Sequence, residues 1–165
     1  MVIPTLRADA RLRECVEALG ELRAGDKRGE ISEWRGATLI NDSYNSNPRA
    51  LDAMVDALLA MPTAGDGRHI VVAGEMLELG PDGEALHRES GQRMAARGVD
   101  VVVGVRGLAA GLVEGAAAGG TKAIFVATPE EAGAWLKENL RPGDTVLLKA
   151  SRGVRLERAL AALTD

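Results

Sequence analysis

Four short apolar segments, separated by stretches with helical spacing, constrain the fold of this chain more than any other feature of its sequence. The segments cover residues 69–73, 100–105, 122–126 and 144–149, and aliphatic side chains dominate each of them. Nearly continuous apolar runs of this length are typical of parallel strands that are buried on both faces. Because strands and helices alternate, the sequence predicts an α/β fold with an open, mostly parallel sheet and helices on both faces.

The helices are predicted from apolar spacing and from capping residues. Apolar residues at helical spacing follow Pro48, which suits the first turn of a helix. Thr128 before Pro129 is typical of an N-cap and a first helical position, for a helix that ends near residue 140. The Gly-rich segment 115–120 is interpreted as a loose helix end. The other predicted helices cover residues 83–97, 108–118 and 154–163.

A hairpin is predicted ahead of the alternating segments. Residues 31–34 and 38–40 flank an Arg-Gly dipeptide that suits a tight turn. This hairpin would add an antiparallel edge to a sheet that is otherwise Rossmann-like. Residues 12–22 show helical spacing that residues 24–30 interrupt, so we expect a short helix and a linker before the hairpin.

Composition narrows the class of protein. A length of 165 residues suits one domain, and 46% hydrophobic with 27% charged residues is a globular balance. The net charge of −4, without a dense basic stretch, argues against nucleic acid as a partner. The single cysteine, Cys15, excludes a disulfide framework within the chain. Without an apolar run of membrane-spanning length or a signal-peptide pattern, we expect a cytoplasmic protein that has no membrane contact.

Function is expected at the carboxyl ends of the strands, where open α/β sheets bind ligands. Five segments follow the predicted strands, and three of them are unusually polar. The polar segments are NDSYNSNP (41–48), GEMLELG (74–80) and KASRG (149–153), and the other two are GVRG (104–107) and ATP (127–129).

The first polar segment, NDSYNSNP, concentrates hydrogen-bonding side chains in a loop. Its candidate ligand-binding residues are Asp42, Tyr44, Asn45 and Asn47. The alternative is that its Asn and Asp residues make turn and capping bonds alone.

The other two polar segments carry charges. GEMLELG offers the carboxylates of Glu75 and Glu78, although a solvated loop would explain them equally well. KASRG places Lys149 and Arg152 beside the amides of an expected helix N-terminus, which suits a carboxylate or a phosphate. Its alternative is a surface-exposed basic pair.

Several catalytic patterns are missing from the sequence. It contains no G-x-x-x-x-G-K-[ST] phosphate loop, no G-x-G-x-x-G after a strand and no convincing Ser-His-Asp or Cys-His arrangement. His87 has no second histidine at metal-ligand spacing, so it is interpreted as a structural or surface residue. The residues alone therefore predict a domain that binds a small polar ligand but lacks a complete catalytic set.

The three polar segments resemble motifs of the Mur ligase family, in its C-terminal domain. NDSYNSNP resembles the N/D-D-S-Y-N-A-N-P segment of the branch that adds D-alanyl-D-alanine to UDP-N-acetylmuramoyl-tripeptide, GEMLELG resembles G-D-M-x-E-L-G, and KASRG resembles K-G-S-R. LHRESG (86–91) is similar to L-H-x-x-x-G, and Arg28-Gly29 to a G-R-G at the domain entrance. The departures are Lys27 for Gly, Ser46 for Ala, Glu75 for Asp and Ala150 for Gly.

The resemblance implies an ATP-dependent peptide ligase that acts in peptidoglycan precursor synthesis through an acyl phosphate. It implies that residues 1–25 are the tail of a central ATPase domain with a linker, and that residues 26–165 are the C-terminal domain of a monomer. The phosphate loop and the Mg²⁺ ligands would belong to the central domain, so this chain alone would be inactive. The alternative is a stand-alone nucleotide-binding or regulatory module that reuses the ligase fold, whereas the missing Gly-rich fingerprint disfavours a dehydrogenase.

The resemblance also implies roles for single residues. Asp42 would accept hydrogen bonds from the ATP ribose, and Arg28 would approach the phosphates when the domains close. The base would lie near Tyr44, Asn45 and Asn47. The residues implied for D-alanyl-D-alanine are Lys149, Ser151 and Arg152, at its carboxylate, with Glu75 and Glu78 in the neighbouring loop.

Overall fold

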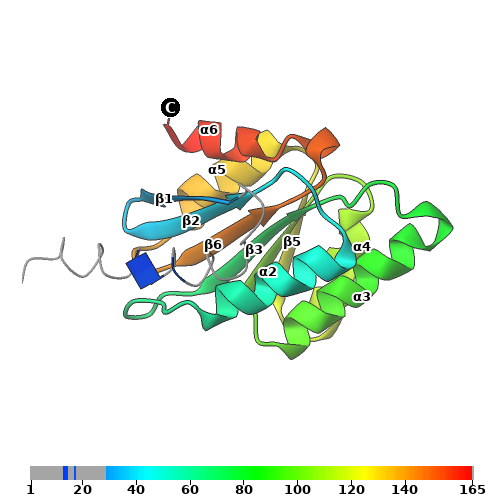
Figure 1. Ribbon diagram of the computed structural model, residues 1–165, viewed down its shortest axis with the longest axis horizontal. Coiled ribbons are helices and arrows are strands. Elements are labelled where there is room, and N and C mark those ends of the chain that lie inside the picture. Colours follow the sequence, from blue (N-terminus) through cyan, green and yellow to red (C-terminus); the bar gives the residue numbers. More distant parts are fainter. Residues whose placement is uncertain (1–12, 15–16, 18–28, 165) are drawn as a thin grey trace, which may run out of the picture.

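A six-stranded sheet lies between two layers of helices in the computed structural model, which describes residues 13, 14, 17 and 29–164 (Figure 1). The strands are β1 (Glu30–Trp34), β2 (Ala37–Asp42), β3 (His69–Gly74), β4 (Val101–Val105), β5 (Lys122–Val126) and β6 (Thr145–Lys149). The helices are α2 (Pro48–Ala60), α3 (Gly83–Ala96), α4 (Ala109–Ala118), α5 (Pro129–Asn139) and α6 (Glu157–Thr164). The short helix predicted for residues 12–22, Cys15 and Arg28 lie largely or wholly outside the described residues.

The strand order explains why helices cover both faces. The order is β1-β2-β6-β3-β4-β5, and every pair except β1 with β2 is parallel. From β3 to β5 the chain moves outward one strand at a time, and from β5 it returns to the middle of the sheet. Since parallel crossovers are right-handed, outward and returning connections must lie on opposite faces. Figure 1 shows this result, with α2, α3 and α4 on one face and α5 and α6 on the other. The predicted α/β fold is confirmed.

The core is divided by the sheet into two apolar clusters. Along β6, Val146 and Leu148 belong to the cluster that contains residues of α5 and α6, whereas Leu147 belongs to the cluster that contains residues of α2, α3 and α4. All three side chains are fully buried. This alternation follows from the two-residue period of a strand, and it explains why both faces of β6 are apolar.

The predicted hairpin is confirmed at the edge of the sheet. Its strands pair antiparallel from Trp34 opposite Ala37 to Glu30 opposite Asn41. Arg35 and Gly36 both have positive φ, 47° and 82°, as a two-residue hairpin turn of the favoured twist requires.

The interpretation of segment 115–120 as a loose helix end is wrong for Gly115. A Cβ on Gly115 would lie 2.1 Å from the carbonyl oxygen of Arg88, and one on Gly91 would lie 1.9 Å from that of Leu112. These two glycines therefore allow the backbones of α3 and α4 to approach closely. Gly119 and Gly120 do end α4, as the C-cap and as a residue with positive φ.

The last helix was also misplaced by the sequence. Residues Arg152–Val154 form a short 3-10 turn, and Arg155 has a left-handed φ of 56°. The helix α6 therefore begins at Glu157 and not at residue 154. Consequently, KASRG does not lead directly into the N-terminus of an α-helix.

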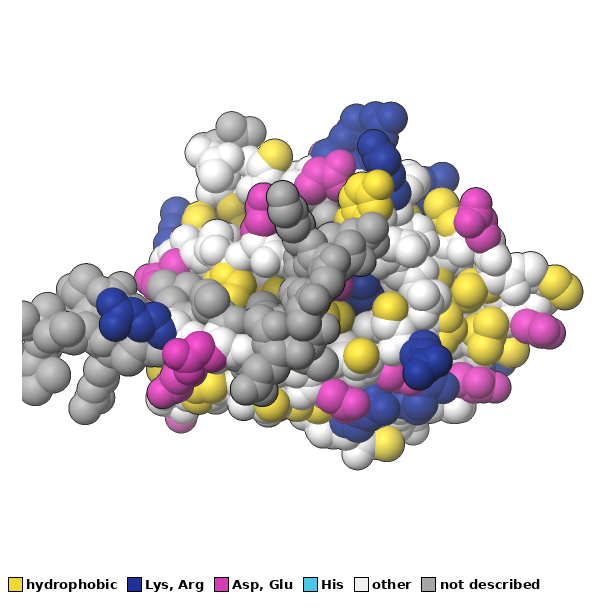
Figure 2. All heavy atoms as spheres, viewed as in Figure 1, with side chains coloured by type: hydrophobic (Ala, Val, Ile, Leu, Met, Phe, Trp, Pro, Cys, Tyr) yellow, Lys and Arg dark blue, Asp and Glu magenta, His cyan; other side chains and the backbone are white. Residues whose placement is uncertain are grey.

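Charges are mixed on the face shown in Figure 2, where Lys and Arg side chains lie among Asp and Glu side chains. Between α2 and α3, for example, Asp52 pairs with Arg93 at 2.9 Å and with Arg97 at 3.1 Å. Among the described residues of this face, charges of opposite sign therefore lie next to each other. Within the described part of the chain, no helix combines the length and the apolar character that spanning a membrane requires.

A buried ion pair joins the amino ends of β3 and β6. The carboxylate of Asp144, which is fully buried, accepts hydrogen bonds from Arg68 Nε at 3.2 Å and Nη2 at 2.7 Å. It also accepts hydrogen bonds from the amides of Arg68 and Arg141, both at 2.9 Å. Burial alone would raise the pKa of Asp144, but these hydrogen bonds and the Arg68 charge hold that pKa below its usual value.

We expect Asp144→Asn to lower the free energy of unfolding by about 3 kcal/mol near neutral pH, because Arg68 would lose its charged partner. A depressed pKa stabilises the fold above the unfolded-state pKa of about 3.9, and this contribution disappears as the pH falls through the folded-state value. Urea unfolding at a series of pH values should therefore show the difference between wild type and variant shrinking in acid. A difference that is independent of pH would contradict this account.

Candidate functional site

The strand order opens a crevice at the carboxyl edge of the sheet. The chain leaves β2 and β3 toward the face of α2 and α3, whereas it leaves β6, which lies between them, toward α6 on the other face. Neighbouring loops that diverge in this way create the position where open α/β sheets bind ligands. NDSYNSNP, GEMLELG and KASRG follow these three strands, so the topology brings the three polar segments together.

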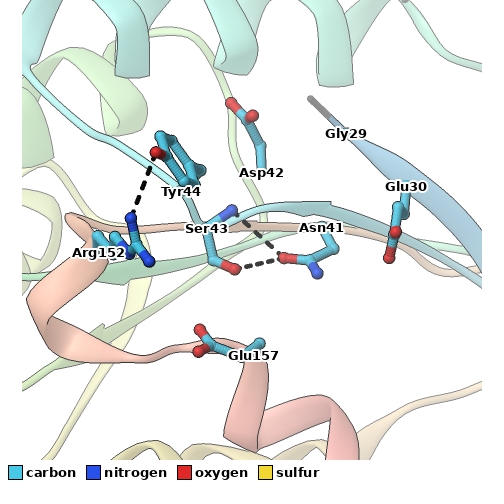
Figure 3. Close-up of a pocket in the computed structure, with 8 residues that line it drawn as sticks. All are labelled: Gly29, Glu30, Asn41, Asp42, Ser43, Tyr44, Arg152 and Glu157. Atoms are coloured by element: carbon cyan, nitrogen blue, oxygen red, sulfur yellow. Dashed lines mark hydrogen bonds between the residues drawn. The ribbon is translucent and has the colours of Figure 1, made fainter. Parts of the chain in front are cut away.

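A cleft of about 370 Å³ lies between the hairpin, NDSYNSNP and the start of α6 (Figure 3). The residues that line it are Gly29, Glu30, Asn41, Asp42, Ser43, Tyr44, Arg152 and Glu157. Of these, Asp42, Tyr44 and Arg152 were candidates from the sequence. Asn41 and Ser43 belong to NDSYNSNP but were not singled out, and Glu30 and Glu157 reach this edge only because the fold brings β1 and α6 to it. Gly29, the second residue of the pair that resembles the family's G-R-G, lines this cleft.

Local hydrogen bonds within NDSYNSNP explain its shape. The Asn41 Oδ1 atom accepts from Ser43 Oγ at 2.5 Å, and Asn45 Oδ1 accepts from the Ser46 amide at 2.8 Å. Asn47 caps α2 by accepting from the Ala50 amide at 2.8 Å. The turn and capping alternative therefore accounts for the side-chain oxygens of Asn45 and Asn47. Neither residue lines the cleft that Asp42 lines.

Asp42 and Lys149 form a buried ion pair at this edge. They are the last residues of β2 and β6 and lie opposite each other in the parallel register. Lys149 Nζ lies 2.7 Å from Asp42 Oδ2 and donates a second hydrogen bond of 2.7 Å to the carbonyl of Asn45. The Lys149 and Asp42 side chains are 4% and 8% exposed, so the alternative of a surface-exposed basic pair is wrong for Lys149. The family resemblance implied the ATP ribose as the ligand of Asp42 and D-alanyl-D-alanine as the ligand of Lys149, whereas in the structure the two side chains bind each other.

Tyr44 and Arg152 form a wall between two hollows. The Arg152 guanidinium carbon lies 5.3 Å from the centre of the Tyr44 ring, and its Nη1 lies 3.4 Å from the Tyr44 hydroxyl (Figure 3). On the far side is a second hollow of about 240 Å³. Its lining residues are Tyr44, Asn45, Leu77, Glu78, Ser151, Arg152 and Gly153. Three residues assigned to D-alanyl-D-alanine therefore meet here: Glu78, Ser151 and Arg152.

The GEMLELG loop is held by hydrogen bonds from three consecutive amides to three different segments. The amides of Glu75, Met76 and Leu77 donate to Val105 O at 3.1 Å, His87 Nε2 at 2.9 Å and Ser151 Oγ at 2.9 Å. These bonds leave Glu78 in a left-handed conformation, with φ 64°, where it lines the second hollow.

Glu75 points away from both hollows. Its carboxylate accepts from the Leu108 amide at 3.2 Å and lies 3.8 Å from Arg106 Nε. It lines neither hollow, so it contacts the loop between β4 and α4 instead.

His87 has a role that the sequence did not assign. Its side chain is fully buried, its Nδ1 lies 2.6 Å from the Gly83 carbonyl, and its Nε2 accepts from the Met76 amide. Because a carbonyl can only accept, the proton must be on Nδ1 and the ring is neutral. His87 thus ties α3 to the GEMLELG loop. Its spacing to Ser90 and Met94, which are buried on the same face of α3, is the signal that could have shown its burial.

A bound Mg²⁺ ion needs a cluster of oxygen ligands. No group of three or more His, Cys, Asp or Glu side chains among the described residues is placed to hold a metal ion. In the cleft, the carboxylate of Asp42 is already paired with Lys149. The described residues therefore do not fit a Mg²⁺ ion by themselves.

The family follows from comparison with known proteins. Residues 27–152 match the family described as "Mur ligase, glutamate ligase domain". The match covers most of the chain, which therefore belongs to the Mur ligase family.

The similar proteins share one name. The chain is 34% identical over 155 residues to the UDP-N-acetylmuramoyl-tripeptide–D-alanyl-D-alanine ligase of Bacillus subtilis, a match that covers 92% of this chain and 34% of that protein. It is 38% identical over 148 residues to the ligase of the same name from Mycobacterium tuberculosis, covering 78% and 29%. The chain thus spans about a third of the length of these relatives.

Solved structures agree with the sequence matches. MurF ligase from Thermotoga maritima, in complex with ADP, superimposes with a TM-score of 0.68 at 28% identity, covering 86% of this chain and 31% of that chain. MurF from Acinetobacter baumannii gives a TM-score of 0.70 at 29% identity, covering 81% and 29%. The resemblance to a Mur ligase C-terminal domain is confirmed, and the similar proteins are MurF ligases.

We expect His87→Leu to lower the free energy of unfolding by about 1–3 kcal/mol, because the buried Met76 amide would lose its acceptor. Hydrogen exchange at the Met76 amide should accelerate more than exchange in the strands. Ser90→Ala, on the same buried face of α3, is the matched control and should leave Met76 exchange unchanged. Equal acceleration in both variants would show that His87 does not specifically hold this loop.

Proposed function

We propose that this chain is the C-terminal domain of an ATP-dependent ligase that joins D-alanyl-D-alanine to UDP-N-acetylmuramoyl-tripeptide. The observation that carries the proposal is the Asp42-lined cleft at the carboxyl edge, in a chain that matches ligases of this name over most of its length. The MurF ligase of Thermotoga maritima, which has the same fold, was crystallised with ADP. A nucleotide is therefore the natural occupant of the cleft.

For the nucleotide, we assign the ribose to Asp42 and the neighbourhood of the base to Tyr44. A carboxylate accepts hydrogen bonds from two adjacent hydroxyls, and charge-assisted bonds of this kind are the stronger ones. Tyr44 is 49% exposed and lines the cleft, where an aromatic ring suits a planar base. We retain Arg28 as the residue that approaches the phosphates, and Asn45 and Asn47 as residues that shape the loop around Tyr44.

For D-alanyl-D-alanine, we assign the second hollow. Arg152 lines this hollow, and its guanidinium suits bidentate binding of a carboxylate. Ser151 lines the same hollow. Glu78 supplies a negative charge on the same hollow, which suits the free amine of the dipeptide. Glu75 takes a supporting role, because it contacts the loop between β4 and α4.

The proposed reaction is an acyl transfer through an acyl phosphate. ATP phosphorylates the tripeptide carboxylate, and the dipeptide amine then displaces the phosphate. We place the phosphate loop and the Mg²⁺ ligands in the part of the relatives' length that this chain does not span. This domain would orient the nucleotide and the amine, and its closure would exclude water from the acyl phosphate.

The isolated chain should show no ATP-dependent ligation of D-alanyl-D-alanine to the tripeptide precursor, because the sequence lacks a phosphate loop. Mass spectrometry of the peptide product, together with phosphate release, measures this directly. The full-length ligase that contains this domain serves as the positive control. Turnover by the isolated chain would contradict its assignment as one part of a larger active site.

Asp42→Ala in the full-length ligase should raise the KM for ATP by about tenfold or more, since a charge-assisted hydrogen bond contributes about 1.5–3 kcal/mol. The KM for D-alanyl-D-alanine should change little, because Asp42 does not line the second hollow. Steady-state kinetics with each substrate varied in turn provides the measurement. An unchanged KM for ATP would remove Asp42 from the ribose role.

A further inference from the structure

Lys149 is buried, and its ammonium group is already bound by oxygen atoms of the protein. Its ammonium group has two oxygen partners at 2.7 Å, one from Asp42 and one from the Asn45 backbone, and the side chain is 4% exposed. It lines neither the nucleotide cleft nor the second hollow. A direct bond to the dipeptide carboxylate, as the family motif implied, would require this buried ammonium to leave both partners.

The two hydrogen bonds of Lys149 hold parts of the protein that form the nucleotide cleft. Lys149 holds Asp42 Oδ2, which limits rotation of the Asp42 side chain, and Asp42 is one of the residues that line the cleft. It also holds the carbonyl of Asn45, the residue that follows Tyr44, and so fixes the backbone that carries the exposed ring. One buried cation therefore orients both side chains that the proposed function assigns to the nucleotide.

We propose that Lys149 is a positioning residue for the nucleotide, acting through Asp42 and the Tyr44 loop, and not a ligand of D-alanyl-D-alanine. The proposal rests on the proposed function, in which Asp42 receives the ribose. The parallel register supports it, because it places Asp42 and Lys149 opposite each other at the ends of β2 and β6. Side chains at such opposed positions point to the same face of the sheet.

The test compares Lys149→Met, Lys149→Arg and the double variant Asp42→Asn/Lys149→Met in the full-length ligase. Lys149→Met should raise the KM for ATP by about tenfold or more and leave the KM for D-alanyl-D-alanine within about twofold. Lys149→Arg, which keeps the charge, should recover part of the ATP affinity. The double variant should be no worse than Lys149→Met, because the two residues act as one unit.

Asp144→Asn is the matched control. It breaks the other buried ion pair of β6, at the amino end of the strand, and lies outside both hollows. It should lower the Tm of the ligase while leaving both KM values unchanged. A purely structural role for Lys149 would make its variants behave in this way.

The two KM values and the Tm distinguish a positioning role of Lys149 from a dipeptide-binding role and from a purely structural role. A raised KM for D-alanyl-D-alanine with an unchanged KM for ATP would overturn the proposal and make Lys149 a dipeptide ligand. A lowered Tm with both KM values unchanged would also overturn it. Absence of ligation by the wild-type full-length ligase would instead refute the proposed function.

A second measurement does not depend on the folding of Lys149→Met. In the wild-type chain, the ¹⁵N resonance of the Lys149 ammonium should shift when ADP is added, and Asp42→Asn should abolish that response. A resonance that responds to D-alanyl-D-alanine and not to ADP would overturn the proposal.

Discussion

The central position of β6 is the constraint on which the rest of the structure depends. The strand is buried on both faces and pairs with β2 on one side and β3 on the other. Its two ends carry the two most buried ion pairs of the described residues, with Asp144 at the amino end and Lys149 at the carboxyl end. Because the chain leaves β6 toward the opposite face from its neighbours, this strand also opens the crevice in which the candidate site lies.

Most of the fold was predictable because its signals are local. Apolar runs defined β3 to β6, and the capping residues Asn47 and Thr128 make the hydrogen bonds typical of a helix start. The start of α6 was mispredicted because the left-handed Arg155 gives no signal in the sequence. The role of Gly115 was missed for a different reason: a glycine near a helix end suggests termination, and only the packing of α3 against α4 shows why it is needed.

The position of the site was predictable from the sequence, but the contacts between its side chains were not. The polar segments after β2, β3 and β6 were identifiable because the carboxyl edge of an open sheet is where ligands bind. That Asp42 and Lys149 neutralise each other depends on strand order, since 107 positions separate them. The turning of Glu75 toward Leu108 likewise depends on the loop after β4. Ser46, which stands where the family motif has Ala, has a buried hydroxyl without a hydrogen-bond partner in the described part of the chain, and nothing in the structure explains it.

The close contact of α3 and α4 at Gly91 and Gly115 has a mechanical consequence. The loop before α3 is GEMLELG, the loop before α4 carries Arg106, and Glu75 bonds one loop to the other. Two helices whose backbones touch cannot slide without a clash, so they and their loops form one stiff block. The side of the second hollow formed by Leu77 and Glu78 therefore belongs to this block, whereas the exposed Tyr44 and Arg152 side chains line the hollow from other segments.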